Sequence, residues 1–226
     1  MELLFLGTGA ADWQPDVKDG AGYHRRFSSC LVDGSLLIDP GPHVPDALAE
    51  YGIDPHAIRY VLVTHPHRDH LSRTALQLLT DAGAVLIDPR GTDCVKAGKY
   101  TVRAYAANHA TAKGAVHYLI DDGEKRLYYA LDGAWLTYPE YRAIRDGGVS
   151  LAVLDATVGD VRGDWRIFEH NNLAMVEEMV HTLRPHVGRF VISHMAYTLH
   201  TDHPTLVARM APLGITVAYD GFKTEI

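Results

Sequence analysis

The sequence has few cysteines, no long apolar run and no excess of basic residues. Its 226 residues include two cysteines, Cys30 and Cys94, and neither belongs to a C-x-x-C pair. This excludes a structural zinc site built on cysteines and predicts a reduced, cytoplasmic setting with both thiols buried and inert. The chain has no apolar stretch of membrane-spanning length and begins without a basic segment, so we expect neither a membrane partner nor a signal peptide. The net charge of -7 argues against nucleic acid as a partner.

The composition and the spacing of apolar residues predict a globular α/β protein. Hydrophobic residues make up 47% of the chain, and its length suits a single domain over residues 1–226. Predicted strands are 2–6, 28–32, 36–38, 60–63, 84–87, 100–107, 116–120, 126–130, 150–154, 190–193 and 216–219. Predicted helices are 44–51, 73–81, 139–147, 173–183 and 201–210. Hairpins come first and then strands alternate with helices, which predicts packed sheets with helices outside.

The stretch Thr64–His70 carries the strongest chemical signal in the sequence. It reads T-H-P-H-R-D-H and follows an apolar, β-branched segment that is typical of a buried strand. Imidazole and carboxylate ligands suit zinc, manganese or iron rather than calcium. In an extended chain His65, His67 and Asp69 would lie on one side, and His70 would be free to serve a second ion. A solvated, histidine-rich loop is the alternative, and it does not explain the buried strand before the motif.

Other predicted strands also end in side chains that can bind a metal, and the carboxyl ends of several strands can meet at one sheet edge. We expect His65, His67 and His109 to bind one ion, Asp69, His70 and His194 to bind a second, and Asp132 to bridge them. Two such ions clamp a hydroxide at neutral pH and act as Lewis acids. For His109, Asp132 and His194 the alternative is a simple capped strand end. Asp39 can bind metal or brace the turn that follows it, and bracing is preferred.

The remaining histidines and an arginine pair give weaker signals. His200 and His203, in H-T-D-H, form either a ligand cluster or, as we prefer, a helix-start loop near the site mouth. Arg25 and Arg26 can contact a phosphate or simply face solvent. Surface or structural positions are expected for His24, His43, His56, His117, His181 and His186.

The heptapeptide, together with His109, Asp132 and His194, resembles the metallo-β-lactamase-fold hydrolases. The resemblance covers nearly the whole chain, and H-x-H-x-D-H is highly specific for this superfamily. It implies an αββα sandwich with a dinuclear metal site at one edge. It also implies that Asp39 supports the site rather than binding metal.

Further motifs resemble the phosphodiesterase branch, which includes PhnP-like cyclic phosphate phosphodiesterases and tRNA 3′-processing ribonucleases. True β-lactamases of this fold replace the aspartate–histidine end of the motif and use a later cysteine, whereas this chain keeps His70. The matching segments are Leu4–Gly9, Arg25–Ser29, Asp155–Thr157, His170–Leu173 and Ile192–His194. The resemblance implies that His170 is a general acid oriented by Asp155; the alternative for His170 is a loop residue beside a helix cap.

The chain departs from both members of that branch. It has no room for the long arm with which the ribonucleases grip tRNA, and it lacks the cysteines of the phosphonate enzyme's structural zinc. We therefore expect a hydrolase of a small phosphodiester, for which a cyclic sugar phosphate and a cyclic nucleotide phosphate are the candidates. It would use two divalent ions, zinc or manganese with iron also suitable, a metal-bridging hydroxide, and Asp69, Asp155 and His170 as catalytic residues. A lactone or thioester hydrolase and an inert metal-dependent sensor are the alternatives, and a homodimer is left open.

Overall fold

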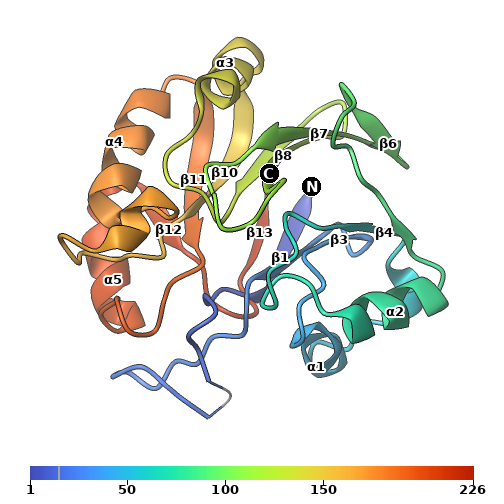
Figure 1. Cartoon of the computed structure of the whole chain (residues 1–226), viewed down its shortest axis with the longest axis horizontal. Helices are drawn as coiled ribbons and strands as arrows, with labels where there is room; N and C mark the ends of the chain where they lie inside the picture. The colour runs from blue at the N-terminus through green and yellow to red at the C-terminus, as the bar shows by residue number, and fades with distance from the viewer. Residues whose placement is uncertain (15) are drawn as a thin grey trace.

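The computed structural model describes residues 1–14 and 16–226. Within these residues two mixed β-sheets face each other, and helices cover the outer face of each sheet (Figure 1). None of the described helices is both long and apolar enough to cross a bilayer. This is the predicted arrangement of packed sheets with helices outside.

The first sheet has the strand order β13-β1-β2-β3-β4-β5, and the second has the order β12-β11-β10-β9-β8-β7-β6. The strands of the first sheet are β1 (Glu2–Gly7), β2 (Ser29–Val32), β3 (Leu36–Ile38), β4 (Tyr60–Leu62), β5 (Val85–Leu86) and β13 (Lys223–Glu225). Those of the second are β6 (Val95–Ala97), β7 (Tyr100–Ala106), β8 (Val116–Asp121), β9 (Arg126–Ala130), β10 (Val149–Asp155), β11 (Val187–Ser193) and β12 (Ile215–Val217). The α-helices are α1 (Val44–Glu50), α2 (Arg73–Asp81), α3 (Tyr138–Gly147), α4 (Leu173–Leu183) and α5 (His203–Met210). Three short 3-10 helices are η1 (Pro55–Ala57), η2 (Trp165–Phe168) and η3 (Ala211–Leu213).

Three buried apolar layers hold these elements together. The central layer joins the facing sides of the two sheets, with Phe5 and Ile38 from one sheet and Tyr129 and Val153 from the other. A second layer packs the outer face of the second sheet against helices that include α4 and α5, and a third packs the first sheet against α1 and α2. Alternating strand residues thus bury both faces of each sheet, which gives the four-layer αββα sandwich (Figure 1).

The predicted strands and helices are all present, with end shifts of a few residues. Two short strands, β6 and β13, were not predicted. The predicted last strand corresponds to β12, and β13 follows it at the edge of the first sheet, where it pairs antiparallel with β1. The β13 sequence Lys223–Glu225 has no apolar alternation, so periodicity could not reveal it. The prediction for Cys94 was also wrong, because Cys30 is buried whereas Cys94 is exposed.

Strand direction brings the site together. Strands β9, β10 and β11 are mutually parallel, and β7 runs the same way because two antiparallel pairings separate it from β9. In the first sheet β3 and β4 are also parallel. Since parallel strands end at the same sheet edge, the residues that follow them gather along that edge.

Candidate metal centre

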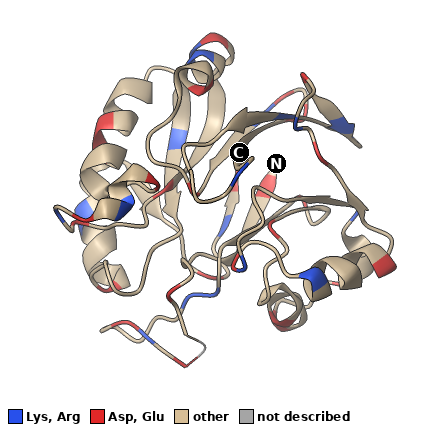
Figure 2. Ribbon diagram, viewed as in Figure 1, with Lys and Arg blue, Asp and Glu red and all other residues tan. Residues whose placement is uncertain are grey.

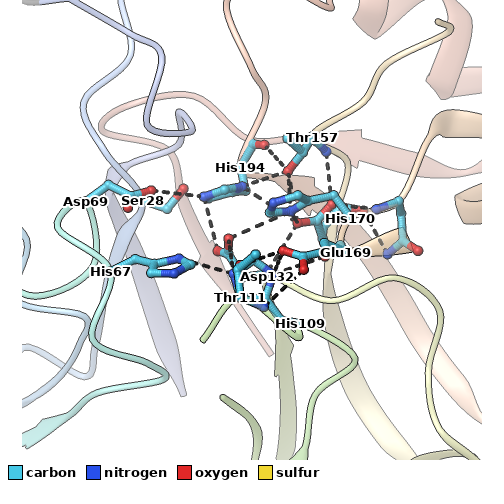
Figure 3. Close-up of polar contacts among 12 residues, drawn as sticks. Ser28, His67, Asp69, His109, Thr111, Asp132, Thr157, Glu169, His170 and His194 are labelled. Carbon is cyan, nitrogen blue, oxygen red and sulfur yellow. Dashed lines mark hydrogen bonds and ion pairs between the residues drawn. The ribbon is translucent and has the colours of Figure 1, made fainter. Parts of the chain in front are cut away.

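The candidate centre lies where the loops after these strands meet, between the edges of the two sheets (Figure 3). Asp39 follows β3 directly, His194 follows β11 directly, and Asp132 comes two residues after β9. All three have left-handed backbone conformations, with φ of 61°, 63° and 56° respectively. A non-glycine residue held there costs free energy, and such strain is typical of functional sites.

Three histidines form the first group of donors. His65, His67 and His109 each offer a ring nitrogen within 4.8 Å of the other two. The Nδ1 of His67 lies 3.2 Å from the Nε2 of His109. The Nδ1 of His109 contacts the backbone oxygen of Glu169 at 3.2 Å, which leaves its Nε2 for the centre.

The second group contains Asp69, His70 and His194. The Nε2 atoms of His70 and His194 lie 3.1 Å apart. The Oδ2 of Asp69 lies 3.4 Å from the first of these nitrogens and 3.6 Å from the second. Asp132 stands between the groups, because its Oδ2 is 2.8 Å from His70 Nε2 and its Oδ1 is 3.9 Å from His109 Nε2. The structure therefore brings together all seven residues that the sequence suggests as ligands.

The donor atoms fit divalent metal ions. Ligands about 2.0–2.1 Å from a tetrahedral zinc ion lie about 3.3 Å from one another, close to the spacings above. The buried His65 Nε2 forms no hydrogen bond with any described residue, and the buried Asp132 Oδ2 faces the Nε2 atoms of His70 and His194. Buried polar atoms are normally paired, and two buried carboxylates beside the histidines need positive charge nearby. Both features are explained by cations bound in this cluster.

Hydrogen bonds behind the cluster orient its histidine rings. The Oδ2 of Asp39, a fully buried carboxylate, lies 2.8 Å from His70 Nδ1. The Thr64 hydroxyl donates to Asp39 and contacts His65 Nδ1 at 3.1 Å. On the other side, the Thr157 hydroxyl lies 2.7 Å from His194 Nδ1. With Nδ1 of each ring occupied, Nε2 is the nitrogen that faces the cluster.

Charge and burial shift the pKa values of His65 and His70 in opposite directions. Burial lowers the pKa of His65 to about 2, so this imidazole is neutral and ready to bind metal. Burial also lowers the pKa of His70, but the carboxylates of Asp132, Asp69 and Asp39 outweigh that effect and raise it well above its ordinary value. In the absence of metal, a proton on His70 would therefore neutralise part of this negative charge.

A pocket of about 240 Å³ opens onto the cluster. His170 lines it, and its Nδ1 lies 2.9 Å from the Oδ2 of Asp155, which is fully buried. Burial opposes protonation of His170, but the negative charge of Asp155 outweighs it and raises the pKa of His170 to about 9. A larger hollow of about 970 Å³ lies between η1 and α2, and no residue of the clusters found among the described residues lines it.

The contact of Asp39 with His70 Nδ1 behind the cluster fits the supporting role that the resemblance implies, but three other sequence interpretations need correction. Asp69 does not continue the row of His65 and His67, because residues 68–70 form a turn in which the His70 backbone N–H donates to His67 O. It lies instead with His70 and His194.

The arginine pair lies outside the pocket. Arg25 is 3% exposed and donates to Thr8 and to the backbone oxygen of Ala218. Arg26 pairs with Glu50. Neither arginine therefore lines the pocket, and Arg25 does not face solvent either.

The H-T-D-H segment is a helix start, as preferred, but it lies outside the pocket lining. Asp202 caps α5 by accepting from the Thr205 N–H. His200 contacts the backbone oxygen of Ala156, and His203 contacts Arg25.

Sequence reasoning missed several residues of the pocket. Trp165 and Arg166 from η2 line it, as does Glu169, whose carboxylate accepts from the N–H and hydroxyl of Thr111. Asp12 also lines the pocket and binds the loop that follows His194. These residues lie in irregular segments where no periodic pattern marks an inward direction. For Trp165, Arg166 and Glu169 the available signal was their proximity to His170 in the sequence.

Sequence comparisons match only part of the chain. A sequence model of the family described as "Anti-Pycsar protein Apyc1" matches residues 1–78. A ribonuclease Z of Aeropyrum pernix is 31% identical over 87 residues, which cover 35% of this chain and 24% of that protein. The match thus spans about a quarter of the relative's length.

Structural comparisons extend over the whole chain. Zinc-bound PqqB from Methylobacterium extorquens covers 100% of both chains with a TM-score of 0.77 and 19% identity. A diphosphatase of the PhnP family covers 100% of this chain and 97% of its own, with a TM-score of 0.74 and 17% identity. The metallo-β-lactamase-fold protein YhfI from Bacillus subtilis covers 100% and 99%, with a TM-score of 0.75 and 14% identity. With its facing sheets, flanking helices and histidine–aspartate cluster at the sheet edge, the chain belongs to the metallo-β-lactamase fold.

Proposed function

We propose that this protein is a dinuclear metal-dependent hydrolase of a small phosphodiester. The observation that carries the proposal is the Asp155–His170 pair beside a seven-residue metal cluster in one pocket. The likeness to a PhnP-family diphosphatase and to a ribonuclease Z supports the choice of a phosphorus ester.

The cluster would hold two divalent ions, for which zinc and manganese are the candidates. His65, His67 and His109 would bind one, Asp69, His70 and His194 the other, with Asp132 between them. When bound, the ions would supply positive charge for the phosphoryl oxygens and a water that loses its proton near neutral pH. The protein's contribution is to fix the donor atoms through Asp39, Thr64 and Thr157.

His170 is suited to protonate the leaving oxygen. Asp155 occupies its Nδ1, so a proton on Nε2 is the one available to substrate. The same carboxylate accepts from the backbone N–H of Asn171 and from the Thr157 hydroxyl, which fixes its orientation. The cationic imidazole would give up that proton as the phosphorus–oxygen bond breaks.

The pocket rim supports a substrate that carries a ring in addition to phosphate. Arg166 uses its Nε and one terminal nitrogen to bind Asp164, which leaves further N–H donors for a phosphate oxygen. Trp165 beside it is 67% exposed and offers an apolar ring face. Aromatic faces stack on nucleobases, so a nucleotide is favoured over a bare sugar phosphate.

The distribution of charge argues against a long nucleic acid as substrate. Figure 2 shows acidic and basic residues interspersed along the ribbon, and the net charge is -7. Binding along a polyanion depends on many cationic contacts and is weakened by such a surface. We therefore propose a small phosphorylated molecule as the substrate.

A substrate panel tests this proposal. Protein loaded with zinc or manganese is assayed on bis(p-nitrophenyl) phosphate, on 2′,3′-cyclic nucleotides and on 1,2-cyclic sugar phosphates. We expect turnover of phosphodiesters, with the nucleotides preferred over the sugar phosphates. Turnover of lactones or thioesters alone would refute the proposal in favour of carboxyl ester chemistry, and tight metal binding with no turnover on any substrate would identify a sensor.

A further inference from the structure

Behind the loop that carries Asp132 lies a buried polar pair that the proposed chemistry does not use. His117, on β8, is fully buried, and its Nδ1 forms a short contact with the Oε1 of Glu140. Glu140 is likewise fully buried in the first turn of α3 and also accepts from the Tyr128 hydroxyl at 2.8 Å. Its Oε2 accepts from the Thr137 backbone N–H and so caps the helix.

The free edge of the His117 ring presses against the residue after Asp132. A Cβ atom added to Gly133 would lie 2.6 Å from both Cε1 and Nε2 of His117. Real Cβ atoms do not approach so closely, and the ring cannot move away freely because Glu140 holds it. Gly133 is therefore the residue whose small size permits this contact.

The same loop is fixed at several other points. The backbone N–H of Asp132 donates to Asp155, and that of Ala134 donates to the backbone oxygen of Asn108. The Trp135 N–H donates to the Asn171 side chain. Between these anchors, the His117 ring is the surface against which Gly133 packs, so it limits how far the Asp132 backbone can shift.

A polar pair at this depth is not the most stable filling for a core. Apolar residues of similar volume commonly give equal or greater stability than a buried charged pair. Moreover, no described residue forms a hydrogen bond with His117 Nε2. The loss of stability from burying His117 and Glu140 is explained if this pair fixes the position of the neighbouring backbone more firmly than apolar packing would.

We propose that His117 and Glu140 are positioning residues that hold the Asp132–Gly133 backbone and so place the Asp132 carboxylate between the two metal sites. This inference rests on the proposed role of Asp132 as a metal ligand. A carboxylate shared by two ions must be placed within a fraction of an ångström, and supporting residues commonly change metal affinity by 10–100-fold.

A double-mutant cycle tests the contact between the His117 ring and Gly133. Zinc affinity and stoichiometry are measured by competition with a chelator for wild type, His117→Ala, Gly133→Ala and the double variant. We expect each single change to weaken binding at least tenfold. In the double variant the added methyl group has room, so Gly133→Ala should cost little beyond His117→Ala.

Two further variants separate positioning from stability. Glu140→Gln keeps the side-chain shape but removes the charge, and we expect weaker zinc binding and an altered absorption spectrum of the cobalt-loaded protein. Tyr128→Phe removes only the hydroxyl contact to Glu140, so it should lower the thermal midpoint of the metal-free protein without changing zinc affinity.

The possible failures are distinguishable. Wild-type zinc affinity in both single variants and Glu140→Gln would overturn the positioning role while leaving the proposed function intact. The positioning role would also be overturned if the double variant lost zinc affinity by the product of the losses in His117→Ala and Gly133→Ala, because the two residues would then act independently. If wild type binds no zinc, manganese or cobalt, the proposed function fails and this inference fails with it.

Discussion

Replacing His170 with alanine should slow hydrolysis by an amount that depends on the leaving group. Asp155 lies 2.9 Å from the His170 Nδ1 and holds the pKa of His170 at about 9, so roughly a hundred imidazoles are protonated for each neutral one at pH 7. Bound cations would lower this ratio by repulsion. A positioned general acid contributes about 10²–10⁴ in rate, equivalent to about 3–5 kcal/mol of barrier.

The leaving oxygen determines how much of that contribution is lost. Ring opening of a 2′,3′-cyclic nucleotide expels a strongly basic ribose alkoxide, so His170→Ala should reduce kcat by about 10²–10⁴. Bis(p-nitrophenyl) phosphate expels a weakly basic phenolate that needs little proton assistance, so its kcat should fall only a few-fold.

The assay compares both substrates at saturating metal. His181→Ala serves as the matched control, because His181 is an exposed histidine on α4 and should leave both rates unchanged. Equal losses on the two substrates, or an unchanged rate on the cyclic nucleotide, would refute the general-acid role of His170.

Four further outcomes follow from the same contacts. Asp155→Asn should lower the pKa of His170 and move the high-pH loss of kcat to lower pH by at least one unit; an unmoved profile would contradict the pairing. Burial raises the pKa of Glu140, but the contact with His117 outweighs it and holds that pKa below its ordinary 4.5. Glu140 therefore contributes stability that is present above about pH 4.5 and is lost as the pH falls, and Glu140→Gln should flatten this acid-side loss in urea unfolding. Trp165→Ala should raise KM for nucleotides about tenfold while leaving KM for 1,2-cyclic sugar phosphates unchanged. Chelation should lower the thermal unfolding midpoint of wild type, and Asp132→Ala should abolish the recovery on adding zinc back.

The sequence was sufficient to predict the fold and to gather the candidate ligands. Alternating apolar residues marked the central strands because each strand buries one or both faces. The heptapeptide Thr64–His70 could be recognised as a metal-binding motif because four possible ligands fall within one short loop after a strand. His109, Asp132 and His194 could be added because each follows a predicted strand.

Features that depend on tertiary contact could not be predicted in this way. Arg25 was expected either to contact a phosphate or to face solvent, yet the fold buries it against Thr8 and Ala218. The residues of η2 have no periodic pattern, so their place on the pocket rim depends on how the loop after β10 folds. His117 and Glu140 are also far apart in the sequence, and only the packing of β8 against α3 reveals the pair.

A metal titration of activity tests the central proposal most directly. Demetallated protein is supplied with increasing equivalents of zinc or manganese while hydrolysis of a 2′,3′-cyclic nucleotide is followed. We predict that activity rises to a plateau at two equivalents per chain, because two ligand groups share Asp132. A plateau at one equivalent would contradict the dinuclear centre, and two tightly bound ions without phosphodiester hydrolysis would contradict the proposed reaction.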